Sequence, residues 1–168
     1  GSGKSTFLKM LLNQIEPDSG LIELSKNYKI GFLEQHIKFT HETIIDEVCS
    51  VLSEDREYEI WKGEKILNGL GFTDEEMLKD PKLFSGGFQV KINLAKLLLL
   101  EPNLLLLDEP TNYLDIHSIR WLKKFLIDWQ DEIILITHDR AFLDSIISHT
   151  LNIHRNNFRK ISGNTIKI

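Results

Sequence analysis

The sequence has little cysteine, no long apolar run and no excess of positive charge. Its single cysteine, Cys49, excludes an internal disulfide framework and favours a reducing compartment. No apolar run approaches the roughly 20 residues that span a bilayer, and the first residues do not resemble a signal peptide. The net charge of −5 argues against a domain that coats nucleic acid, so we expect no DNA partner. The 168 residues, 42% of them hydrophobic, are enough for one domain with a real core.

The stretch 104–115 organises the rest of the chain. Its four consecutive leucines are too few for a stable helix and are typical of a strand buried on both faces of a parallel sheet. Asp108 and Glu109 follow directly, at the carboxyl end of that strand, which is the sheet edge where ligands bind in open parallel sheets. A metal and a reacting group could meet there. The alternative is a polar strand end that runs into a turn at Pro110.

The first six residues precede an apolar stripe at helical spacing, so a glycine-rich loop opens a helix. This is typical of the second half of a P-loop, in which backbone N–H groups and the helix dipole hold phosphates. Lys4 would reach the β- and γ-phosphates, and the Ser5 hydroxyl suits Mg²⁺. A terminal linker remnant is the alternative. The first glycine of the pattern and its preceding strand are missing, so we interpret the sequence as a fragment.

Residues 84–89 form a second candidate anion site. Ser85 can cap the helix that follows, while Gly86 and Gly87 leave its first N–H groups approachable. A structural turn is an equally good interpretation of this segment alone.

Two polar residues stand just after apolar strands. Gln35 follows a strand expected at 28–33, and His138 follows one expected at 133–136. Because parallel strands end at one edge, His138 should lie beside Asp108 and Glu109. Taken singly, Gln35 fits a surface side chain and His138 fits a structural histidine.

The rest of the chain is expected to contain both helices and strands. A strand is expected at 21–24, helices at 40–52 and 54–68, and a short helix that starts with a capping box at 73–76. Tyr58 and Trp61 are expected in the core. Helices at 116–126 and 141–147 and terminal strands at 151–168, with a turn at 162–164, close the chain.

These motifs in this order resemble the nucleotide-binding domain of the ATP-binding cassette (ABC) superfamily, over essentially the whole chain. The resemblance implies an α/β P-loop NTPase core with a mostly parallel sheet, formed by 1–35 and 103–168, and a helical signature subdomain at 36–102. Within the superfamily the chain looks most like the ABC-F group, and in particular its first domain. The residues behind this finer assignment are 31–35, 84–95, 108–115 and 137–144.

The resemblance also implies roles for single residues. The phosphates of ATP would be held by Gly1, Ser2, Gly3, Lys4, Ser5 and Thr6. Mg²⁺ would be ligated by Ser5, Gln35 and Asp108. Glu109 would act as the base or polariser of the attacking water, and His138 would contact the γ-phosphate. The ATP of a facing domain would meet the signature residues Phe84, Ser85, Gly86, Gly87 and Phe88, with Asp115 lining the same interface.

Partners follow from the same resemblance. They are ATP, a second ABC cassette and, for an ABC-F-like protein in the cytoplasm, the ribosome. The alternative is the ATP-binding subunit of a membrane transporter, which would add a membrane partner. Phe84 and Phe88 depart from the commonest Leu and Gln of the signature, and Lys91 stands where Arg is frequent. The first P-loop glycine and the strand before it are also missing, so we expect this fragment to bind ATP poorly in isolation.

Overall fold

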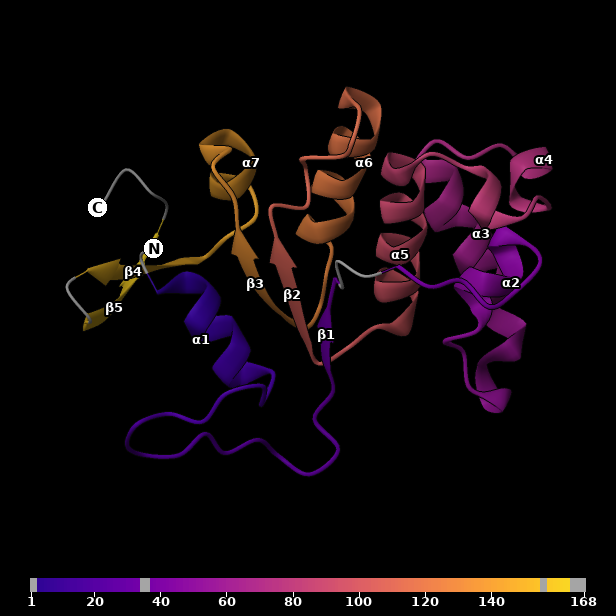
Figure 1. Ribbon diagram of the computed structural model, residues 1–168. Coiled ribbons are helices and arrows are strands. Elements are labelled where there is room, and N and C mark those ends of the chain that lie inside the picture. Colours follow the sequence, from indigo (N-terminus) through magenta and orange to yellow (C-terminus); the bar gives the residue numbers. More distant parts are fainter. Residues whose placement is uncertain (1–2, 34–36, 155–156, 164–168) are drawn as a thin grey trace.

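The computed structural model describes residues 3–33, 37–154 and 157–163 (Figure 1). Strands β1 (Ile30–Phe32), β2 (Leu104–Asp108) and β3 (Glu132–Ile136) form a parallel sheet in the order β1-β2-β3. Leu104 pairs with Ile30 on one side and with Glu132 on the other. The expected strand at 104–108 is therefore the central strand of this sheet.

Strand β2 is buried on both faces, as its leucine run predicts. Leu104 and Leu106 pack with Leu8 of helix α1 (Lys4–Leu11). Leu105 and Leu107 face the larger core, to which α5 (Gly86–Leu100) and α6 (Ile116–Ile127) contribute. The sheet is thus covered on both faces, which fits an α/β architecture with parallel strands.

The helical part of the chain packs on α5. Helices α2 (Ile44–Cys49), α3 (Ile60–Gly69) and α4 (Asp74–Met77) lie on the side of α5 that is away from the sheet (Figure 1). Short 3₁₀ helices occur at Glu54–Glu59 and Pro81–Leu83. The capping box before α4 is confirmed, with Thr73 and Glu76 exchanging side-chain and backbone bonds.

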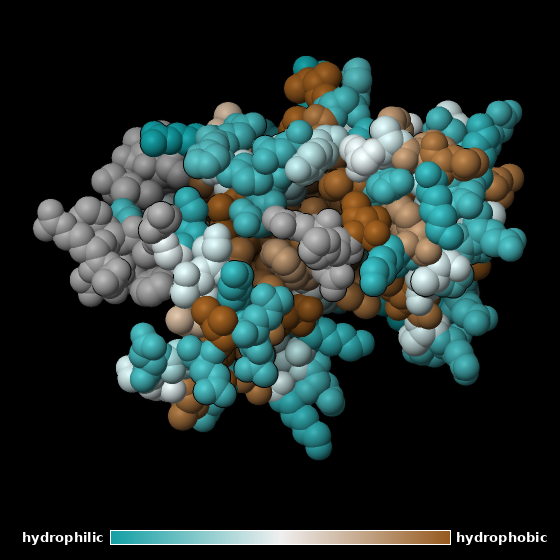
Figure 2. All heavy atoms as spheres, in the orientation of Figure 1, coloured by the Kyte–Doolittle hydropathy of each residue, from teal (hydrophilic) through white to brown (hydrophobic). Residues whose placement is uncertain are grey.

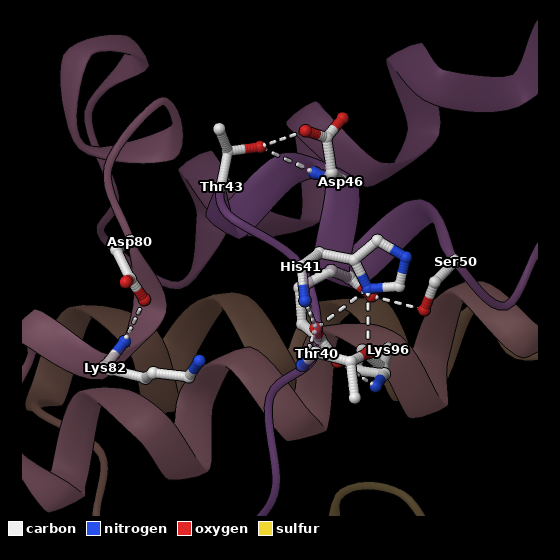
Figure 3. Close-up of polar contacts among 9 residues, drawn as sticks. Thr40, His41, Thr43, Asp46, Ser50, Asp80, Lys82 and Lys96 are labelled. Atoms are coloured by element: carbon white, nitrogen blue, oxygen red, sulfur yellow. Dashed lines mark hydrogen bonds and ion pairs between the residues drawn. The ribbon is translucent and has the colours of Figure 1, made fainter.

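A buried carboxylate fastens the segment before α2 to α5. Glu47 is 1% exposed, and its Oε2 accepts hydrogen bonds of 2.9 Å from the backbone N–H groups of Thr40 and His41. Lys96 of α5 donates to its Oε1 at 2.5 Å. Thr40, His41 and Lys96 lie together in Figure 3. Burial alone would raise the pKa of Glu47, but the bonds from Lys96, His41 and Thr40 prevail and lower it to about 2.

Several expected elements differ from those observed. Residues 21–24 form no strand, because an apolar run becomes a strand only by pairing, and none of the described segments pairs with them. Helix α2 is shorter than the expected 40–52, since Thr43 accepts a bond from the Asp46 N–H and starts the helix there. The expected helix at 54–68 is divided into a 3₁₀ segment and α3.

The expectation that Tyr58 and Trp61 are core residues is wrong. Tyr58, in the 3₁₀ segment before α3, is 75% exposed. Trp61 is 54% exposed, because α3 turns Gly63, Ile66 and Leu67 inward instead. Figure 2 shows hydrophobic residues among hydrophilic ones on the face turned to the viewer.

The end of the described chain is a short helix and a hairpin. Helix α7 (Arg140–Asp144) is followed by strands β4 (His149–His154) and β5 (Asn157–Ser162), which pair antiparallel. The pairing runs from His149 opposite Ser162 to His154 opposite Asn157. The turn expected at 162–164 includes Asn164, which lies outside the described residues. None of the helices in the described residues has the length and apolar content that crossing a bilayer requires.

Candidate functional site

Helix α1 presents its N-terminus without a side-chain cap. Gly3 occupies the N-cap position with φ of 81°, a left-handed conformation that glycine adopts readily, and its carbonyl accepts the Phe7 N–H at 2.9 Å. Lys4, Ser5 and Thr6 form the exposed first turn. A helix start of this kind favours an anion, because its first N–H groups and the helix dipole point outward. Gly1, Ser2 and Gln35 lie outside the described residues.

The carboxylate of Asp108, at the end of β2, is affected by two other charged side chains. Asp108 closes the strand, and Glu109 follows it. Partial burial raises the pKa of Asp108, and the negative charge of Glu109 raises it further, while the positive charge of Lys4 lowers it. The charge of Lys4, at the start of α1, therefore acts on the carboxyl end of β2.

Glu109 and His138 lie in contact across the ends of β2 and β3. The Glu109 backbone N–H donates to the Ile136 carbonyl at 2.8 Å. Its carboxylate accepts the His138 backbone N–H at 3.4 Å, and its Oε1 lies 3.4 Å from His138 Nε2. Glu109 has φ of 48°, a conformation that is unfavourable for a residue with a Cβ and persists where the surroundings fix it. The His138 side chain is 89% exposed, so its ring can meet a ligand.

The segment 84–88 stands at the start of α5. Ser85 occupies the N-cap position, but its side chain makes no capping bond, so the expected side-chain cap is wrong. A Cβ built at Gly86 or Gly87 would meet no atom within 4 Å, so this helix start is open to an approaching group. Phe84 and Phe88 pack edge-on against Phe72, with ring centroids 6.0 and 5.4 Å away.

The structure adds one residue that sequence reasoning left without a role. Lys91 is 5% exposed, and its Nζ lies 2.6 Å from Asp115 Oδ2 and 4.8 Å from the Phe88 ring centroid. The hydrogen bond from Lys91 and the backbone N–H of Ser118 hold the pKa of Asp115 well below its usual range. Asp115 also caps α6, accepting the N–H groups of His117 and Ser118 at 3.0 Å. An aspartate directly before an apolar helical stripe is an N-cap signal, but nothing in the sequence identifies Lys91 as its partner.

Sequence comparison identifies the relatives of this chain. A family model described as ABC transporter matches residues 1–112. The uncharacterized ABC transporter ATP-binding protein YfmM of Bacillus subtilis is 33% identical over 204 residues, which cover 97% of this chain and 39% of YfmM. ABC transporter F family member 4 of Arabidopsis thaliana is 40% identical over 103 residues, which cover 61% of this chain and 14% of that protein. The chain thus spans well under half the length of these relatives.

Solved structures share the fold. An ATP-binding subunit of an ABC transporter superposes with a TM-score of 0.80 at 23% identity, covering 96% of this chain and 74% of that one. The archaeal ribosome recycling factor aABCE1, solved in complex with the ribosomal stalk protein aP1, gives a TM-score of 0.71 at 25% identity, covering 89% of this chain and 29% of that one. The chain belongs to the ABC transporter family, has relatives in the F group, and has the mixed α/β fold of an ABC ATPase domain.

Proposed function

We propose that this domain binds Mg²⁺-ATP and hydrolyses it when it faces a second ABC cassette, in an ABC-F-like protein that acts on the ribosome. The observation that carries the proposal is the contact between Glu109 and His138 at the carboxyl edge of the sheet, beside Asp108, whose carboxylate is also affected by the positive charge of Lys4 of α1. Such an arrangement suits ATP hydrolysis, because phosphoryl transfer depends on positioning and on stabilising charge.

The phosphates of ATP would bind at the start of α1. Its open N-terminus and the Lys4 ammonium attract phosphate oxygens, and Gly1, Ser2, Gly3 and Thr6 belong to the same proposed loop. Mg²⁺ is commonly held by one or two protein oxygens together with substrate phosphates. Ser5 and Asp108, with Gln35, offer oxygen donors of that kind, and the ion would offset phosphate charge when bound.

Glu109 would orient and polarise the attacking water. The His138 backbone N–H holds one oxygen of its carboxylate, while the left-handed backbone at Glu109 fixes the direction in which the side chain leaves the strand end. The exposed His138 ring would contact the γ-phosphate and stabilise the charge that develops there.

The start of α5 would bind the ATP of a facing cassette. Ser85, whose side chain makes no capping bond, and the uncrowded Gly86 and Gly87 suit a phosphate approaching from outside. Phe84 and Phe88 would support this loop by packing on Phe72. Asp115 would line the same interface. Its carboxylate also caps the start of α6.

The likeness to an F family member and to a ribosome recycling factor supports action on the ribosome, in the cytoplasm. The likeness to an ATP-binding transporter subunit favours a second candidate, in which cassette closure acts on a membrane partner.

The test uses the full-length protein with Glu109→Gln, which removes the carboxylate but keeps the side-chain shape. We expect hydrolysis to fall by about 10²–10⁴-fold, as for loss of a general base, while ATP stays bound.

Cell extract carrying this variant is sedimented through sucrose gradients with and without ATP, with Lys4→Ala as the control that should not retain ATP. Ribosome co-sedimentation that requires ATP supports the first candidate, whereas ATP-dependent recovery with membranes supports the second. Full hydrolysis by Glu109→Gln contradicts the proposed role of Glu109.

A further inference from the structure

A buried ammonium joins three segments of the chain. Lys91 of α5 reaches Asp115 at 2.6 Å, at the start of α6. The buried Ser118 hydroxyl lies 2.8 Å from the same Asp115 oxygen and 3.1 Å from the Leu70 carbonyl, at the end of α3. Asp115 and Ser118 at the start of α6 are therefore bonded both to α5, through Lys91, and to the end of α3, through the Leu70 carbonyl.

The loop that ends at Asp115 begins at Glu109. Inside it, the Asn112 N–H donates to the Glu109 carbonyl at 3.2 Å, and the Leu114 N–H donates to the Thr111 carbonyl at 3.1 Å. The Glu109 end is held by β3 and His138, as described above. The Asp115 end is held by α6 and Lys91, so a short, internally bonded loop connects the partner of Lys91 to Glu109.

Lys91 also stands close to the segment 84–88. Its ammonium lies over the Phe88 ring, and Phe88 packs with Phe84 and Phe72. A cation over an aromatic face is attracted to it, so the charge contacts both the base of this segment and the loop after Glu109.

We propose that Lys91 is a positioning residue that couples the 84–88 segment at the start of α5 to the loop carrying Glu109. Engagement of a facing cassette by Ser85, Gly86 and Gly87 would then set the orientation of Glu109 in this cassette through Lys91 and Asp115. The inference rests on the proposed function, since it assigns a communication step between the two proposed nucleotide contacts.

The chemistry of the pair allows this role to be separated from simple packing. Methionine has nearly the length of lysine and fits a buried channel, but it provides no charge and no donor. Asp115 keeps its bonds to the α6 N–H groups when Lys91 is replaced, and its side chain is half exposed, so its charge stays solvated. Lys91→Met should therefore keep the fold and lose the ion pair with Asp115.

The test measures ATP affinity, kcat and KM for the full-length protein and for Lys91→Met and Lys91→Arg, with a fluorescent ATP analogue as the binding probe. We expect Lys91→Met to bind the analogue with wild-type affinity and to keep KM. Its kcat should fall between about 10- and 100-fold, the scale for a small misplacement at a reacting centre. Lys91→Arg should restore most of kcat, because a guanidinium can still bond to Asp115.

The matched control is Lys96→Met, which removes a lysine from the same helix but from a different partner, Glu47. It should lower the melting temperature and leave kcat unchanged. If Lys91→Met does not fold, Lys91→Gln takes its place. Its shorter, uncharged side chain forms no ion pair with Asp115, and the variant should show the same loss of kcat.

Wild-type kcat in Lys91→Met, or in Lys91→Gln used in its place, overturns the inference. The inference is also overturned if the kcat of Lys91→Arg is as low as that of Lys91→Met. It is overturned as well if the control Lys96→Met loses as much kcat as Lys91→Met. A full-length wild-type protein without ATP turnover overturns the proposed function itself, which distinguishes the two failures.

Discussion

The buried carboxylate of Glu47 allows a stability prediction with a defined pH dependence. Glu47→Gln keeps the size of the side chain and an oxygen that can accept from the Thr40 and His41 N–H groups. It removes the negative charge that faces Lys96. The variant therefore isolates the electrostatic contribution of this cluster.

The magnitude follows from the pKa of Glu47 in the folded protein. A fall from the ordinary value of 4.5 to about 2 corresponds to roughly 3 kcal/mol of folding free energy. Because the folded pKa is lowered, this stabilisation is complete above pH 4.5 and is lost as the pH falls through 2. At pH 3 about half of it should remain.

Urea unfolding followed by far-ultraviolet circular dichroism measures this contribution. We expect Glu47→Gln to lower the free energy of unfolding by about 3 kcal/mol at pH 7 and by about half as much at pH 3. Glu42→Gln, an exposed change in the same segment, is the control and should stay within about 0.5 kcal/mol of the wild type. An equal loss for Glu47→Gln at both pH values would refute the reasoning, because the cost would then lie in packing rather than in charge.

Two further substitutions test the packing of α3 and the start of α5. Gly69→Ala should destabilise the protein by about 1–3 kcal/mol although alanine favours helices, because a Cβ at Gly69 would collide with the Trp121 ring. Thermal unfolding beside the exposed neighbour variant Asn68→Ala checks this, and a stabilised Gly69→Ala would contradict the observed packing. Ser85→Ala should leave the melting temperature unchanged, because the Ser85 side chain makes no capping bond, but should lower ATPase activity in the full-length protein. A loss of stability as large as the roughly 1 kcal/mol of a capping serine would show that Ser85 does cap α5.

Much of the candidate site could be predicted from local sequence. The leucine run at 104–107 can bury four side chains only as a strand covered on both faces, and that is what the structure shows. Parallel strands end at a common edge, so residues just after two such strands become neighbours, and Glu109 and His138 do lie in contact. The capping box at Thr73 is equally local, because all of its partners lie within one turn.

Other features depend on contacts between distant segments. Residues 21–24 have an apolar pattern, but pairing with another strand decides whether a strand forms. Which face of α3 is buried depends on its neighbours, and that choice leaves Trp61 exposed. The sequence by itself determined the central strand, the main helices and the residue types at the sheet edge, because each depends on periodicity or on near neighbours. Only the tertiary structure decided that Lys91 meets Asp115, since 24 positions separate them and their charges are paired by the packing of α5 beside the start of α6.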